Sequence, residues 1–234
     1  MWVVAEYEAV TLFSLRLSSA TASGGKTLLV PTPFALKMAL LDVACRALGV
    51  GGAEQLWPML RNMTLALQPS EKAVVTNLFQ KVLRPRRNAV PHYEPDAGPF
   101  QRTIGYREYV QLVGPMGVAF DVTDAGLVEQ LSDLLLHVTY LGKRGSFMQI
   151  QALPRQVDSL PPGYVVVDGE QREFRLDGVL QMLDDCGPTL TFNRANIYSG
   201  ERVTVGKERI IRHVVLPYRL ARSSKSFSLY ERIE

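Results

Sequence analysis

The sequence has little that would support a metal centre, a disulfide framework or a membrane anchor. Its two cysteines, Cys45 and Cys186, lack metal-ligand spacing, so we expect two buried thiols, with a single disulfide as the alternative. Its three histidines, His92, His137 and His213, are equally dispersed. No hydrophobic run reaches membrane-spanning length, and the N-terminus lacks the basic start of a signal peptide. These absences predict a cytoplasmic protein without a metal or other cofactor.

The composition predicts a folded protein with a mildly basic charge. The chain has 234 residues, of which 47% are hydrophobic and 21% are charged, enough to bury a full core. The net charge is +3 and the pI is about 8.9. These values permit a nucleic-acid partner without requiring one, so the clustering of basic residues carries more information than their sum.

The chain is organised around residues 23–48, in which a glycine-lysine segment precedes an apolar helix. Thr32 is suited to cap that helix and Pro33 to begin it, because the first helical N–H has no partner within the helix. We expect this helix to pack on a sheet, with Lys37 on its wetter side. Gly49 is expected to end it.

The remaining pattern favours an α+β fold, because strands and a few helices follow one another without regular alternation. Residues 3–17 predict one long strand, and Asp124 predicts the cap of a helix over 125–136. Residues 106–113 and 117–122 resemble two strands paired through Gly114. The acidic stretch 176–185 has a helical pattern.

Residues 84–103 combine four prolines with clustered arginines. So many prolines exclude a helix or a central strand, which predicts a long exposed loop of a kind that is usually functional.

Two catalytic interpretations have limited support. Residues 20–27 approach the phosphate-binding P-loop pattern, but Pro31 and Pro33 prevent a helix from beginning at Lys26 and Thr27, as that site requires. His92, in the basic loop, is a candidate acid or base for RNA cleavage.

Basic clusters interleaved with aromatic residues give a stronger signal, because guanidinium groups bind phosphates and aromatic rings stack on bases of single-stranded RNA. The alternative for each cluster is an ordinary solvated surface. The clusters lie at 81–109, at Lys143 and Arg144, and in a basic tail that contains Arg219, Arg222 and Lys225.

A long first strand, a glycine-containing segment, a helix led by Pro31-Thr-Pro33 and the later turn Tyr140-Leu-Gly-Lys-Arg-Gly together resemble the CRISPR-associated Cas-five family of RAMP proteins. The resemblance covers about the first 150 residues in organisation. It implies an RRM-like (ferredoxin-like) domain over 1–153 with a protruding basic thumb at 84–103, followed by a smaller β-rich region over 154–234.

The resemblance also implies a non-catalytic subunit of a type I Cascade complex in antiviral defence. Such a subunit caps the crRNA 5′ handle, contacts backbone and large subunits, and meets target DNA indirectly. One branch of the family cleaves precursor crRNA, so an endoribonuclease using His92 is the alternative. The expected RNA-binding residues are Arg16, Gly24, Gly25, Lys26, Thr27, Lys37, Arg84, Arg86, Arg87, Arg102, Tyr106, Arg107, Lys143 and Arg144.

Overall fold

A computed structural model describes residues 1–17, 25–88, 90, 92–93, 97–168 and 175–233. In these ranges the strands are β1 (Trp2–Ala9), β2 (Leu65–Gln68), β3 (Lys72–Pro85), β4 (Phe100–Val113), β5 (Met116–Asp121), β6 (Met148–Ile150), β7 (Arg155–Val157), β8 (Val165–Val166), β9 (Val179–Cys186), β10 (Arg209–Leu216), β11 (Tyr218–Ser223) and β12 (Phe227–Arg232). The helices are α1 (Pro33–Asn62), α2 (Ala125–Leu136) and α3 (Phe192–Ala195). No described helix is long and apolar enough to cross a membrane.

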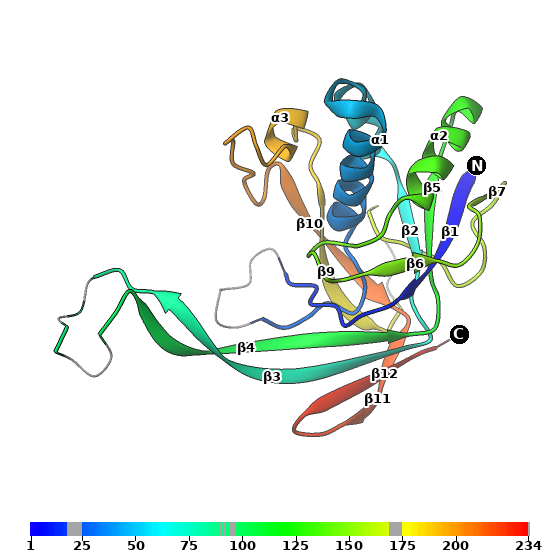
Figure 1. Cartoon of the computed structure of the whole chain (residues 1–234). Helices are drawn as coiled ribbons and strands as arrows, with labels where there is room; N and C mark the ends of the chain where they lie inside the picture. The colour runs from blue at the N-terminus through cyan, green and yellow to red at the C-terminus, as the bar shows by residue number, and fades with distance from the viewer. Residues whose placement is uncertain (18–24, 89, 91, 94–96, 169–174, 234) are drawn as a thin grey trace.

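The central sheet has the order β6-β1-β5-β2-β8, and every neighbouring pair is antiparallel. With α1 following β1 and α2 following β5, strands β1, β2, β5 and β6 have the βαββαβ arrangement of a ferredoxin-like fold. Both helices lie on one face of this sheet (Figure 1). The expected α+β fold with a ferredoxin-like core is therefore confirmed.

Helix α1 begins as the sequence predicted. The Thr32 hydroxyl accepts a hydrogen bond from the Ala35 N–H at 3.1 Å, and Pro33 is the first helical residue. Gly49, with φ of 74°, kinks the helix, which then continues to Asn62. The predicted Asp124 cap of α2 is also confirmed, because its side chain accepts from the Gly126 N–H at 2.9 Å.

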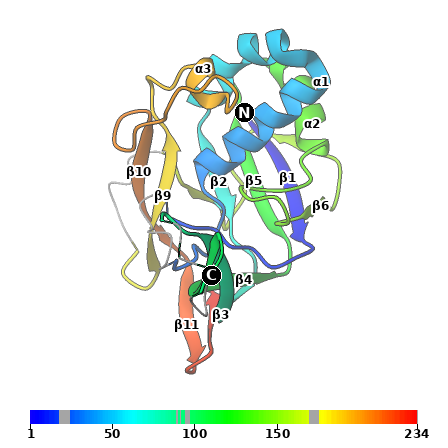
Figure 2. The same ribbon diagram turned by 60° about the vertical axis from the view of Figure 1, so that its left-hand side comes forward.

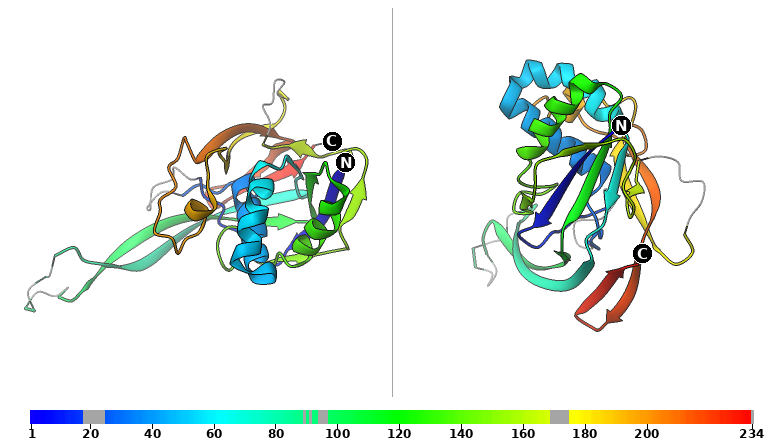
Figure 3. Two further views of the ribbon diagram at one scale, coloured as in Figure 1. Left: turned by 90° about the horizontal axis from the view of Figure 1, so that it is seen from above. Right: turned by 90° about the vertical axis from the view of Figure 1, so that its right-hand side faces the viewer.

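A second sheet, in the order β11-β12-β3-β4, carries a long hairpin arm. Strands β3 and β4 pair over fourteen consecutive positions, from Lys72–Val113 to Pro85–Phe100. The arm extends far from the body (Figures 1 and 3). Arg84 and Arg102 therefore lie in paired strands, so the predicted loop is shorter than 84–103. Pro85 is tolerated because it is the last residue of its strand.

Three other expectations about local structure are wrong. The first strand ends at Ala9, although Phe13 and Leu15 are buried as expected. Strands β4 and β5 do not pair across Gly114, because β4 pairs with β3 while β5 pairs with β1 and β2. The acidic stretch 176–185 contains no helix and instead contributes most of β9, which pairs with β10 beside α1 (Figure 2).

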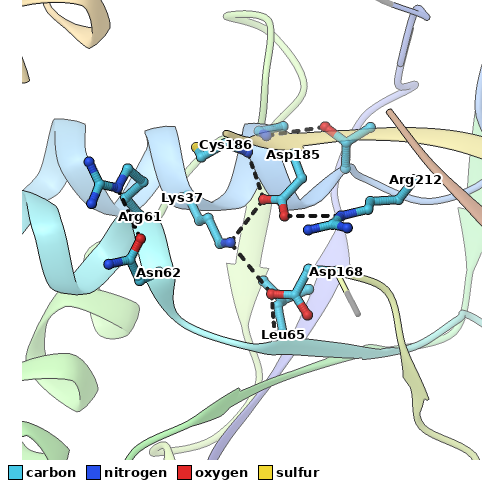
Figure 4. Close-up of polar contacts among 10 residues, drawn as sticks. Lys37, Arg61, Asn62, Leu65, Asp168, Asp185, Cys186 and Arg212 are labelled. Atoms are coloured by element: carbon cyan, nitrogen blue, oxygen red, sulfur yellow. Dashed lines mark hydrogen bonds and ion pairs between the residues drawn. The ribbon is translucent and has the colours of Figure 1, made fainter. Parts of the chain in front are cut away.

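Lys37 is also placed wrongly by the sequence, because it lies in the core rather than on the wetter side of α1. Its side chain is only 2% exposed. Its ammonium contacts Asp185 at 2.8 Å and Asp168 at 3.4 Å (Figure 4). Arg212 lies 3.7 Å from the other oxygen of Asp185. Burial raises the pKa of Asp168, while the Leu65 N–H and the Lys37 ammonium oppose that shift.

Replacing Lys37 by methionine is expected to destabilise the fold by about 3–5 kcal/mol, because two buried carboxylates lose their shared cation. Chemical denaturation of the purified protein measures this change. Arg46→Met is the control, since Arg46 pairs with Asp42 at the surface of the same helix; its cost should stay below about 0.5 kcal/mol. Unchanged stability in Lys37→Met, with weakened RNA binding, would instead restore Lys37 as an RNA ligand.

Candidate nucleic-acid interface

Glu108 on β4 attaches the Gly-Lys-Thr segment to the arm. Its carboxylate accepts hydrogen bonds from the Thr27 N–H at 2.8 Å and from the Tyr106 hydroxyl at 3.0 Å. Its backbone N–H donates to the Gly25 carbonyl at 3.1 Å. The bonds to Thr27 and Gly25 hold the segment along the outer edge of β4 and leave the Lys26 side chain exposed.

The same segment is closed on its other side by residues 15–16. The Thr27 hydroxyl accepts from the Leu15 N–H at 3.1 Å, and Arg16 and Thr27 form a β-bridge. A side chain at Gly25 would be tight, because a Cβ there would lie 3.3 Å from Arg16 Nε. The glycine therefore allows the arginine side chain to lie against the backbone. Helix α1 begins six residues after Thr27, so the geometry of a P-loop is not formed.

The arm presents different side chains on its two faces, because directly paired residues of antiparallel strands point the same way. One face carries Phe79 opposite Tyr106 and Leu83 opposite Arg102. The two rings lie 5.1 Å apart at an angle of 52°, and Phe79 is 70% exposed. Burial and the hydrogen bond to Glu108 raise the pKa of Tyr106. This face combines a fixed aromatic pair with a cation.

The tip of the arm is basic and hollow. A cavity of about 650 Å³ is lined by Arg84, Arg86, Arg87 and their neighbours. The Arg86 side chain donates to the Phe100 carbonyl at 3.2 Å, which fixes one guanidinium at the base of the tip. An anionic chain could contact all three guanidinium groups here.

The second predicted glycine turn, residues 140–146, packs against the rest of this region. The Thr11 hydroxyl donates to the Gly145 carbonyl at 2.6 Å, and a Cβ at Gly142 would lie 4.0 Å from that of Ala35 in the first turn of α1. Lys143 and Arg144 are exposed at its tip. Residues 10–13 join this turn to β4, where Phe13 and Val110 exchange backbone hydrogen bonds.

The structure brings together most of the predicted residues. Those in one connected region are Arg16, Gly25, Lys26, Thr27, Arg102, Tyr106, Lys143 and Arg144, with Arg84, Arg86 and Arg87 around the cavity at the arm tip. Arg107 lies on the opposite face of the arm from Tyr106 and Arg102. Lys37 is buried, and Gly24 lies outside the described residues.

Sequence reasoning missed Glu108 and Phe79. Nothing in one sequence marks an acid as the anchor of a distant loop. Phe79 lies on the same strand face as the buried Val75, four positions before it, so its exposure follows once the strand is known to leave the core.

Chemistry at a metal has no support among the described residues, where no group of three His, Cys, Asp or Glu side chains could hold an ion. Both cysteines are free thiols, as expected, rather than the two halves of a disulfide. His92 is exposed.

No family model matches the chain. The chain is 21% identical over 206 residues to the CRISPR-associated protein Cas5 of Archaeoglobus fulgidus, and the match covers 86% of each chain. The resemblance to the Cas5 family is confirmed. The chain is also similar to the solved structure of a CRISPR protein from Archaeoglobus fulgidus, with a TM-score of 0.48, 13% identity and coverage of 100% of this chain and 92% of that chain. A chain of a CRISPR RNA-guided surveillance complex matches with a TM-score of 0.47, 16% identity and coverage of 92% and 90%.

Glu108→Ala is expected to loosen the Gly25–Thr27 segment from β4. The Thr27 N–H loses its acceptor, which costs about 1–3 kcal/mol in local stability, whereas the Tyr106 hydroxyl keeps Asn77 Oδ1 at 2.8 Å. Native-state hydrogen exchange should show the Thr27 amide exchanging about tenfold faster or more. Glu108→Gln, which keeps an acceptor oxygen, is the matched control. Equal exchange rates in Glu108→Ala and the parent protein would show that the carboxylate does not hold the segment.

Proposed function

We propose that this chain is a Cas5-type, non-catalytic subunit of a CRISPR surveillance complex that holds the 5′ handle of crRNA. The observation that carries the proposal is the docking of residues 25–27 on β4, which places the exposed Lys26 beside the strand that carries Tyr106. The similarity to a Cas5 protein supports the same role.

The binding path runs from the turn at Lys143 and Arg144, along residues 10–16, to Lys26 and then out along the arm. Backbone and side-chain hydrogen bonds connect each part to the next. Cations along this path neutralise phosphates, and the exposed ring of Phe79 is available to an unstacked base. A flexible single strand can follow such a path, whereas a stiff duplex cannot.

The arm supports contacts with neighbouring subunits, because it projects beyond the body and exposes apolar side chains. Leu83 is 66% exposed and Ile104 is 65% exposed. We propose that backbone and large subunits of a Cascade complex cover this surface and that target DNA is met through the assembled complex rather than through this chain alone.

The endoribonuclease alternative has no specific observation in its favour. No described residue forms a hydrogen bond or an ion pair with His92. A general acid or base needs a partner that orients it toward the scissile phosphate. The cleavage question is settled by incubating the protein with end-labelled repeat RNA and comparing His92→Ala with the parent.

Replacing Lys26 by alanine is expected to weaken binding of a crRNA 5′-handle oligonucleotide by roughly 3- to 10-fold at low salt, because one phosphate contact is lost. The slope of log affinity against log salt should flatten by about 0.7 for a single strand. Fluorescence anisotropy over a salt series measures both quantities.

Lys207→Ala is the control, since Lys207 is exposed on the loop before β10, away from the path. Its affinity and its salt slope should match those of the parent. Equal behaviour of the two variants would contradict the proposed site, and cleavage of the labelled RNA that is lost in His92→Ala would contradict the non-catalytic role.

A further inference from the structure

The sheet formed by β11, β12, β3 and β4 has one face that packs on the body and one that does not. Ala73, Val75, Val110, Leu112 and Tyr218 point to the inner face and are all buried. The opposite side, here called the outer face, carries Lys72, Val74, Thr76, Leu78, Arg107, Tyr109, Gln111, Val113, Arg219, Arg222, Phe227, Leu229 and Glu231. None of these is buried. The three helices lie on the far side of the molecule from β11 and β12 (Figure 1).

The outer face is unusually apolar for a solvated sheet surface. An antiparallel sheet with one face on the core normally presents polar residues on the other. Here six of the thirteen outer-face side chains are aliphatic or aromatic, and Leu78 and Val113 are each 40% exposed. An exposed apolar patch of this kind marks a binding surface.

The charge of the outer face is positive. Lys72, Arg107, Arg219 and Arg222 contribute four cations against the single acid Glu231. Glu231 lies 3.7 Å from Lys72 and 3.6 Å from Arg219, so it balances only that end. Neither Arg107 nor Arg222 forms an ion pair with a described residue, so their positive charges favour an anionic ligand.

Two aromatic rings lie between these cations, on the strands that flank β3. Tyr109 on β4 and Phe227 on β12 both pair with Thr76 on the intervening strand β3. They are therefore two strand spacings apart, about 10 Å at the backbone. Arg107 follows on the same face of β4, and Arg222 lies opposite Leu229, two residues along β12 from Phe227. Aromatic residues on one face of a four-stranded antiparallel sheet, with basic residues around them, form a surface that stacks unpaired bases and neutralises their phosphates.

We infer that this outer face is a second binding surface for a single-stranded nucleic acid, with Tyr109 and Phe227 stacking on bases and Arg107 and Arg222 contacting phosphates. It is separate from the proposed crRNA path, because Lys26 and Tyr106 lie on the edge and the inner face of β4. It also gives a role to the basic C-terminal cluster, which the crRNA path does not use. RNA and single-stranded DNA share the required chemistry.

The test is photo-crosslinking of the full chain to two probes, a 15-nucleotide oligo(U) carrying 4-thiouridine and a 15-nucleotide oligo(dT) carrying 4-thiothymidine, with the crosslinked peptides mapped by mass spectrometry. We expect crosslinks at Tyr109 or Phe227 in addition to residues 25–27. Phe227→Ala and Arg222→Gln should each reduce the outer-face crosslink by about fivefold or more. Leu229→Ala, a loss of apolar area on the same strand, is the matched control and should change it less than twofold.

Each other outcome decides between the two proposals. Crosslinks confined to residues 25–27 overturn the outer-face surface and leave the crRNA path intact. Crosslinks confined to the outer face, unchanged in Lys26→Ala, overturn the crRNA path and leave the outer-face surface intact. An equal loss in Leu229→Ala and Phe227→Ala overturns the stacking role and indicates an apolar surface for a protein. Arg222→Gln keeps the test decisive if Phe227→Ala fails to fold, because Arg222 is exposed. Preference for one of the two probes identifies the ligand as RNA or DNA.

Discussion

The structure depends on one buried ammonium. Lys37 joins helix α1 to Asp168, just after β8, and to Asp185 on β9, while Arg212 on β10 approaches the same cluster. Three parts of the chain that are far apart in sequence therefore share one set of charges. A carboxylate in this position is tolerated only with its cation, because an unpaired buried charge costs several kcal/mol. The cluster consequently fixes where the β9–β10 sheet sits against the ferredoxin-like core.

The charged residues fall into two sets, those buried in ion pairs that stabilise the fold and those exposed to solvent. The acids Asp184, Asp185 and Glu208 are buried against Lys37, Arg209 and Arg194. The cations at Lys26, Lys143 and Arg144 are exposed instead. Among the described residues four acids and one cation are buried, so the exposed charges are more basic than the net charge of +3 indicates. The exposed surface is more basic than the composition indicates, which is the condition for binding a polyanion.

The same buried acids mark where sequence reasoning fails. The start of α1 at Pro33 and the cap of α2 at Asp124 are local features, set by a side chain and the next three residues, and both are predicted correctly. Strand β9 is not, because Asp184 and Asp185 look like surface residues until Arg209 and Lys37 are known to meet them across 25 and 148 residues of chain. Lys37 is misplaced for the same reason. In the site, the basic clusters are visible in the sequence, whereas Glu108 is not, because its partner Thr27 is 81 residues away.

The arm explains how one strand pair can serve two surfaces. Fourteen uninterrupted pairs keep the alternation of side chains in register from the core to the tip, so every second residue stays on the same face. Near the body, the inner face is used for packing, and further out, the same face becomes the Phe79–Tyr106 surface. The outer face does not pack on the core. Strands β12 and β11 extend the sheet beside β3 and enlarge this face. An insertion or deletion of one residue early in β3 would turn the following β3 side chains to the other face and separate Phe79 from Tyr106 and Leu83 from Arg102. The regular pairing of the arm is therefore a requirement of its two-sided chemistry, and this accounts for a hairpin far longer than a connection between β2 and β5 needs.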